Sequence, residues 1–253
     1  MRRDDLIRFL DEYLDVPAVA GKDYCPNGLQ VEGAAEVRHI VCGVTACHAL
    51  IAGAAERNAD TVLVHHGILW GGAMPTITRS FKARVKALFD SDLNLLAYHL
   101  PLDRHPEVGN AVTVARRLGL TALEPFGEHR GLHVGIRGRF EAPLAIDGLA
   151  RRVAESLSAD GIVFPFGEGL VSTVGIVTGA ADKELPQALT AGLDCFLTGE
   201  ISEYVMHFAR EESLHFIAAG HHNTERYGVQ ALAAEIERRF GVTWEFLDVP
   251  NPA

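Results

Sequence analysis

The chain has 253 residues, and 33 acidic against 23 basic side chains give it a net charge of −10. A hydrophobic content of 48% with 22% charged residues is ordinary for a folded protein and excludes disorder, collagen-like repeats and coiled coil as the main state. The acidic balance lacks the basic surface of a nucleic-acid-binding protein, so nucleic acid is not an expected partner. No run of about 18 uncharged apolar residues is present, so we expect no membrane span or membrane partner.

The four cysteines show no pairing typical of zinc ribbons or thioredoxin-like proteins. Cys25, Cys42, Cys47 and Cys195 form no C-x-x-C motif. We interpret them as reduced thiols and predict a cytoplasmic protein. The charged start, Met1-Arg2-Arg3-Asp4-Asp5, leads into an amphipathic segment and does not resemble a signal peptide.

Hydrophobic periodicity predicts alternating helices and strands in the first half of the chain. We expect helices over residues 4–14, 49–57, 79–89 and 110–118 and strands over 37–45, 61–64 and 93–97, with a loop at 23–32 that enters a short strand. Gly119 follows the last of these helices, the usual place for a C-terminal glycine. This order indicates an α/β fold with a largely parallel sheet.

The second half repeats the pattern of the first. Val44-Thr45 matches Val177-Thr178 at an offset of 133, and Asp60 matches Asp194 at 134. A longer ungapped match has a constant offset of 122 and aligns His99, Asp103, Arg104, Arg116-Arg117 and Gly119 with His221, Glu225, Arg226, Arg238-Arg239 and Gly241. We therefore predict an internally duplicated fold of two intertwined α/β lobes, residues 1–127 and 128–253, with mixed, largely parallel sheets.

Chemistry-bearing residues gather at three predicted strand ends. In Val64-His65-His66-Gly67, the glycine permits the turn that lets both histidines converge. Residues 97–103 follow the next strand, and Pro101 forbids a regular helix, so we expect a loop there. Strand ends are where ligands bind in α/β sheets.

The third place is residues 220–225, which follow an apolar strand at 216–219. A helix that begins at His221 places His221 and Glu225 on one face, whereas a helix that begins at Asn223 or Thr224 uses one of those residues as its N-cap. His222 could replace His221 as a ligand. Glu225 has an alternative role as an acid favoured in a first helical turn.

Nitrogen and oxygen donors without thiolate suit zinc, manganese, iron, cobalt or nickel. Five candidate ligand side chains exceed the three that a lone catalytic zinc takes, and a carboxylate such as Glu225 can bridge two ions. We therefore predict two divalent metal ions per chain, at a site between the lobes. The predicted ligands are His65, His66, Asp103, His221 and Glu225.

Two further features lie near these ligands. Arg104 and Arg226 either hold an anionic substrate or offset the ligand carboxylates. Trp70-Gly71-Gly72 is either a mobile flap beside the metals or a surface turn after a strand.

Four motifs together resemble the Nif-three-like family, whose members also carry the name GTP cyclohydrolase I type 2 homologue. They are residues 25–33 (CPNGLQVEG), 64–67 (VHHG), 99–103 (HLPLD) and 219–226 (AGHHNTER), and the resemblance covers nearly the whole chain. It implies a duplicated, intertwined α/β fold, a dinuclear metal site and a homohexameric ring with the metal sites facing an internal cavity. Motif matching places the family's ligands on the same five residues, with His99 nearby as a catalytic or supporting group.

Two function classes follow. The first is a metal-dependent hydrolase, cyclohydrolase-like, that acts on a small anionic, nucleotide-like or heterocyclic substrate, with His99 as proton shuttle. The second is a non-catalytic metal chaperone, storage protein or regulatory scaffold. Open coordination positions favour the first class, whereas a saturated site with fast metal release favours the second.

Overall fold

The computed structural model describes residues 1–71, 75–158 and 160–253. Its backbone divides into two compact units, each built from both halves of the chain. Unit 1 contains Met1–Leu102 and Gly228–Pro250, and unit 2 contains Asp103–Tyr227 and Asn251–Ala253. The predicted division into sequence repeats at residues 127 and 128 stays a prediction.

Unit 1 places a mostly parallel sheet between helices. Its elements are α1 (Arg3–Tyr13), η1 (Val16–Val19), β1 (Gly28–Val31), β2 (His39–Thr45), α2 (His48–Glu56), β3 (Thr61–His66), α3 (Arg79–Asp90), β4 (Asn94–Ala97), the start of α4 (Leu100–Asp103), the later part of α9 (His221–Phe240) and β11 (Thr243–Phe246). The strand order is β1-β4-β3-β2-β11, with β1 antiparallel to β4 and the other pairs parallel.

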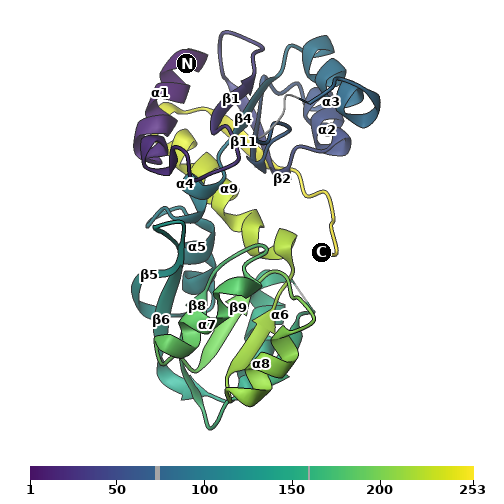
Figure 1. Cartoon of the computed structure of the whole chain (residues 1–253). Coiled ribbons are helices and arrows are strands. Elements are labelled where there is room, and N and C mark those ends of the chain that lie inside the picture. The colour runs from purple at the N-terminus through teal and green to yellow at the C-terminus, as the bar shows by residue number, and fades with distance from the viewer. Residues whose placement is uncertain (72–74, 159) are drawn as a thin grey trace. The chain divides into compact units, whose positions relative to one another are not determined.

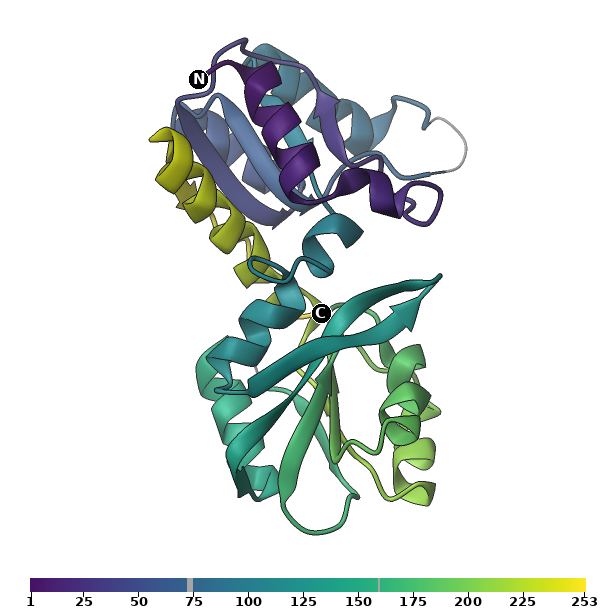
Figure 2. The same cartoon turned by 90° about the vertical axis from the view of Figure 1, so that its left-hand side faces the viewer.

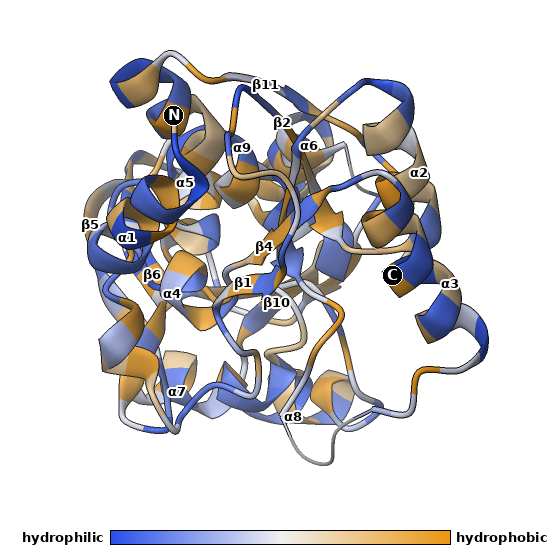
Figure 3. Cartoon of the chain, turned by 90° about the horizontal axis from the view of Figure 1, so that it is seen from above, coloured by the Kyte–Doolittle hydropathy of each residue, from blue (hydrophilic) through white to orange (hydrophobic). Residues whose placement is uncertain are grey.

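Helices α1 and α9 meet through Phe9 and Phe240, whose ring centroids lie 5.0 Å apart, and α2 and α3 cover the opposite face of the sheet (Figure 1). Alternate strand residues such as Val62, Val64 and Leu95 are fully buried in the cluster beneath α2 and α3. Figure 3 shows the hydropathy pattern that matches this burial. Helix α3 carries both hydrophilic and hydrophobic residues, whereas β4 is mostly hydrophobic.

Unit 2 is also a mixed α/β unit. Its elements include the last residue of α4, α5 (Asn110–Arg117), β5 (Thr121–His129), β6 (Leu132–Leu144), α6 (Ile146–Leu157), β7 (Ile162–Pro165), β8 (Val171–Ile176), η2 (Asp182–Glu184), α7 (Leu185–Thr190), β9 (Cys195–Thr198), α8 (Val205–Glu211), β10 (His215–Ala218) and the start of α9. The strand order is β5-β6-β8-β9-β10-β7. Strands β5 and β6 are the long teal strands of Figure 2.

The two sheets share a run of four strands. The order β7-β10-β9-β8 in unit 2 has the same directions as β1-β4-β3-β2 in unit 1, with an antiparallel edge strand followed by parallel pairs. This correspondence is what an internal duplication requires, and it agrees with the sequence offset of 134 between Asp60, which precedes β3, and Asp194, which precedes β9.

The β5–β6 hairpin of unit 2 is not among the elements that the sequence predicted. Its strands pair antiparallel up to His129 and Leu132, and the two residues between them, Arg130 and Gly131, have φ angles of 52° and 75°. Positive φ at both positions is typical of the tight turn that matches strand twist.

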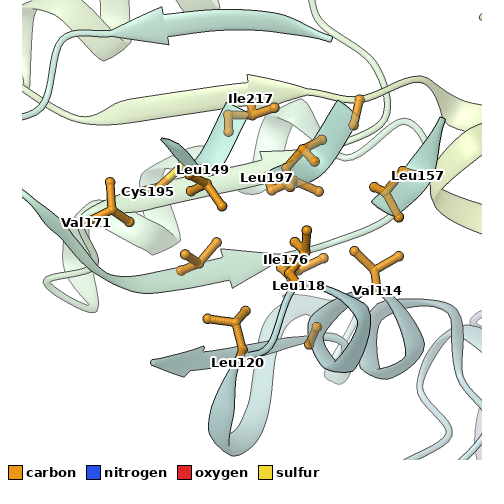
Figure 4. Close-up of a cluster of buried hydrophobic side chains, with 14 of the residues drawn as sticks. Val114, Leu118, Leu120, Leu149, Leu157, Val171, Ile176, Cys195, Leu197 and Ile217 are labelled. Carbon is orange, nitrogen blue, oxygen red and sulfur yellow. The ribbon is translucent and has the colours of Figure 1, made fainter. Parts of the chain in front are cut away.

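The core of unit 2 lies between its sheet and helices α5 and α6. Val114 from α5 and Leu149 from α6 meet Ile176, Leu197 and Ile217 from three neighbouring strands, and all five are fully buried (Figure 4). This packing fixes the ends of the strands that carry the candidate site.

All four cysteines lie within the described residues and are free thiols, as the sequence predicted. Burial raises the pKa of Cys25 and of Cys42 to about 12. In the described part of the chain, no helix combines the length and apolarity needed to cross a membrane.

We predict that Ile176→Ala lowers the free energy of unfolding by about 2–5 kcal/mol, because it opens a cavity in a fully buried position. Leu170→Ala, at a side chain that is 56% exposed, is the control and should change it by less than about 0.5 kcal/mol. Urea unfolding measures both, and equal midpoints would contradict the assignment of this core.

Candidate metal centre

The end of β3 brings two histidines together. The strand includes both, and their ring centroids lie 4.6 Å apart, so His65 and His66 converge as predicted. His65 is fully buried, and its Nδ1–H donates to the carbonyl oxygen of Tyr98 at 2.9 Å. This bond fixes the tautomer and leaves the lone pair of the ring on Nε2, the arrangement of a metal-binding histidine. The Nδ1 atom of His66 lies 3.1 Å from the hydroxyl of Thr45.

His99 completes the imidazole set of unit 1. It follows β4, and one ring nitrogen from each of His65, His66 and His99 lies within 4.8 Å of the other two. The backbone N–H of His99 donates to Asn27 Oδ1 at 2.7 Å, and its Nδ1–H donates to Asp23 Oδ1 at 2.8 Å. His99 is thereby held at both backbone and ring.

Asp23 is a buried carboxylate that the sequence analysis missed. Only 2% of its side chain is exposed, and besides His99 it accepts hydrogen bonds from the backbone N–H groups of Cys25 and Leu100 and from the amide of Asn27. Burial would raise the pKa of Asp23, but the hydrogen bond and charge of His99 together with these donors lower it to about 2.

Unit 2 contains a second group of candidate ligands, which has more carboxylates than the imidazole set of unit 1. Helix α9 begins at His221, not at Asn223 or Thr224, and places His221 Nε2 at 3.0 Å from Glu225 Oε2. His221 Nδ1 lies 2.5 Å from Glu200 Oε1, a partner that the sequence analysis also missed. Burial lowers the pKa of His221, but Glu225 and Glu200 outweigh it and raise the pKa to about 9.

Gly179 lies directly against the side chains of Glu225 and His221. A Cβ atom there would lie 2.2 Å from Glu225 Oε1 and 3.1 Å from His221 Nε2, and the residue has a φ angle of +69°. Its N–H donates to Thr224 Oγ1 at 3.1 Å. Both the space and the backbone conformation therefore require glycine.

Asp103 lies beside Glu225 in unit 2. It is buried, and its Oδ1 accepts from Asn110 Nδ2 at 2.8 Å and from Thr178 Oγ1 at 3.3 Å. A carboxylate oxygen of Asp103 lies within 4.8 Å of one of Glu225. Two buried carboxylates this close repel each other, and a cation bound by both would reduce that repulsion, so the donor set fits a divalent metal ion.

The structure corrects one prediction about this region. The sequence predicted a loop through Pro101, and this is wrong, because Leu100–Asp103 form one helical turn. Proline is the second residue of that turn, where it interrupts no hydrogen bond of the helix.

The structure also places the other residues that the sequence analysis named. Arg104 and Arg226 are half-buried, and the Arg226 guanidinium lies 5.7 Å from the ring of Tyr227. His222, the alternative ligand, is buried, and its N–H donates to the carbonyl oxygen of Ala253. Trp70 lies beside the histidines of unit 1, whereas Gly72 of the predicted flap lies outside the described residues.

Comparison with known proteins gives a match over nearly the whole chain. The family model Duf34/NIF3 (NGG1p interacting factor 3) matches residues 1–252. A Pseudomonas aeruginosa protein called GTP cyclohydrolase 1 type 2 homolog is 46% identical over 98% of this chain and 97% of its own length. A Pyrococcus abyssi protein of the same name is 42% identical over 99% of both.

Solved structures show the same fold. The Thermus thermophilus protein TTHA1606 superposes with a TM-score of 0.92 at 40% identity and full coverage of both chains. HcgD from Methanocaldococcus jannaschii has a TM-score of 0.83 at 19% identity, covers 98% of both chains and shares the fold.

We predict that Asp23→Asn lowers the free energy of unfolding by about 2 kcal/mol at pH 7, since the shift of the Asp23 pKa from 3.8 to about 2 stabilises the folded state above pH 4. The contribution is lost as pH falls through the folded pKa, and about half is gone near pH 3. Asp5→Asn, at an exposed carboxylate paired with Arg8, is the control. Urea midpoints that fall equally in both variants would contradict this role for Asp23.

Proposed function

The chain belongs to the Duf34/NIF3 family, and we propose that it binds two divalent metal ions through His65, His66, Asp103, His221 and Glu225. One observation carries this proposal: the buried carboxylates of Asp103 and Glu225 have oxygens within 4.8 Å of each other. We propose His65 and His66 of unit 1 as the further nitrogen donors that two ions would need.

The chemistry of the donors supports this choice. Imidazole and carboxylate suit borderline divalent metals such as zinc, manganese, iron, cobalt and nickel. Five donors exceed the three of a lone catalytic zinc site, and a carboxylate can bridge a second ion. The buried thiols of Cys25 and Cys42 have pKa values of about 12 and are poor ligands at neutral pH.

For the reaction, we propose the hydrolysis of a small anionic substrate with a nucleotide-like or heterocyclic structure. The name of the relatives, GTP cyclohydrolase 1 type 2 homolog, supports this class. Divalent ions, when bound, act as Lewis acids and lower the pKa of a bound water. His99 is the proposed proton shuttle of this hydrolysis. It would take up and release the proton at Nε2, because its Nδ1–H is committed to Asp23. Arg104 and Arg226 are the proposed contacts for anionic groups of the substrate.

A second candidate is reversible metal handling. His221 Nε2 and Glu225 Oε2 lie 3.0 Å apart and stabilise each other without an ion, which favours a site that can release its metal. Transfer of the ion to a chelating acceptor distinguishes the two, because a catalytic site resists transfer and a delivery site permits it. The family resemblance also leads us to propose a homohexamer, which the mass in solution tests.

We predict about two divalent ions per chain in fully loaded protein, measured by elemental analysis with protein concentration from amino-acid analysis. Glu225→Ala should lose most of both ions, since its carboxylate would be shared between them in the proposed site, and His65→Ala should lose mainly one. His207→Ala, whose side chain is 60% exposed, is the histidine control and should retain both ions. One ion or fewer in the fully loaded parent protein would exclude the dinuclear site.

We predict that His99→Ala retains both ions but slows turnover by about 10²-fold to 10⁴-fold, the usual contribution of a general acid or base. The assay follows release of product from GTP first and then from a panel of nucleotides and heterocycles. Loss of metal in this variant would make His99 a ligand. Unchanged turnover with full metal content would remove it from the mechanism.

A further inference from the structure

Two large aromatic side chains of unit 1 are exposed to solvent. Trp70 is 42% exposed and Tyr24 is 60% exposed. Aromatic side chains contribute large contact areas to binding sites, and an exposed pair beside polar groups is typical of a recognition surface.

Trp70 and Tyr24 lie on two separate segments, and the side chain of Gln30 hydrogen-bonds to the segment that carries Trp70. Gln30 Oε1 accepts the N–H groups of Ile68 and Leu69 at 2.8 and 3.0 Å, and Gln30 Nε2 donates to the carbonyl oxygen of Leu69 at 3.3 Å. A Cβ atom at Gly67 would lie 2.2 Å from Gln30 Oε1, so glycine is required for this approach. The motif at residues 25–33 thus fixes the segment that carries Trp70.

The second connection is closer to the aromatic rings. The N–H of Gly71, the residue after Trp70, donates to the carbonyl oxygen of Tyr24. A Cβ atom at Gly71 would lie 3.0 Å from that oxygen and 3.4 Å from the Tyr24 ring. Trp70 and Tyr24 are therefore held on neighbouring segments of backbone.

Trp70 also contacts the imidazole set. Its ring centroid lies 5.2 Å from that of His99 with an angle of 82° between the planes, and 5.9 Å from that of His66 with an angle of 45°. Neither imidazole lies parallel to the indole, so these contacts position the indole without stacking flat upon it.

We propose that Trp70, flanked by Tyr24, is a stacking surface for the planar heterocycle of the substrate. Rings of purine size stack on indole faces largely independently of their substituents, whereas the sugar and phosphate of a nucleotide have no flat face to offer. A heterocycle stacked on Trp70 lies next to His99 and His66. This inference rests on the proposed function and narrows its substrate class to compounds with a flat heteroaromatic ring.

Intrinsic fluorescence tests the contact directly, because the chain has only two tryptophans. Trp244 is on β11, at the opposite edge of the sheet from β1, and its Nε1–H donates to Glu237. In zinc-loaded Trp244→Phe protein, Trp70 is the sole indole. Guanosine monophosphate should quench its emission, whereas ribose 5-phosphate, which has the same phosphate but no base, should not. Equal effects of the two ligands would overturn the proposal.

Equilibrium dialysis of guanosine monophosphate gives the matching affinity test on zinc-loaded protein. Trp70→Ala should weaken binding by about 5-fold to 100-fold, as expected for the loss of one base-stacking contact, and Trp70→Phe by less. Trp244→Ala is the matched control and should bind as the parent protein does. Equal affinity of Trp70→Ala and the parent protein would refute the stacking surface.

Metal content, measured on the same samples, separates this inference from the metal proposal. Trp70→Ala should retain its zinc, because the indole is not a ligand. If the parent protein binds the nucleotide through Trp70 but holds no metal, the metal proposal fails and the stacking surface stands. If Trp70 emission changes with protein concentration and not with nucleotide, a second copy of the chain covers the indole, and the stacking surface is wrong.

Discussion

The pairing of a histidine ring with a carboxylate is the interaction on which both donor sets depend. In unit 1, buried Asp23 holds Nδ1 of His99. In unit 2, Glu225 and Glu200 hold the two nitrogens of His221. An unpaired carboxylate would be costly at the buried positions of Asp23 and Glu225, so each of these two carboxylates fixes the position of a ring while the ring compensates its charge.

The fold supplies these pairs by placing polar residues just beyond the ends of parallel strands. His65 and His66 end β3, His99 follows β4, and His221 follows β10. Gly179 follows β8 and Glu200 follows β9, its parallel neighbour, so these short segments meet at one edge of the sheet of unit 2. The strands themselves are buried, and their packing fixes the segments that extend beyond them.

The sequence predicted the helices and parallel strands because their periodicity is local. It also placed the histidines of unit 1 near one another, because the ends of neighbouring parallel strands meet at one sheet edge. It missed Asp23, because the contact of this residue with His99 spans 76 positions and leaves no periodic signal.

The sequence analysis was wrong about the turn at Pro101 and missed the β5–β6 hairpin, and both have local causes. Proline at position 101 predicts a break in any helix, although the structure places it in the first turn of α4, where proline is tolerated. The β5–β6 hairpin turns at Arg130-Gly131, and this pair lacks the Asn-Gly signature that makes such turns recognisable.

The two donor sets differ in how ready they are for a cation. The Nδ1–H of His65 is committed to the backbone carbonyl of Tyr98, so its tautomer already suits a metal. His221 instead pairs its Nε2 with Glu225 Oε2, so a cation would have to displace this ion pair and its proton before Nε2 could act as a ligand. If a cation binds as proposed, this cost falls on unit 2, where the attraction between the cation and the carboxylates of Asp103 and Glu225 would have to exceed the energy of the pair it breaks. Gly179 reduces this cost because it leaves the carboxylate of Glu225 room that any larger residue would fill.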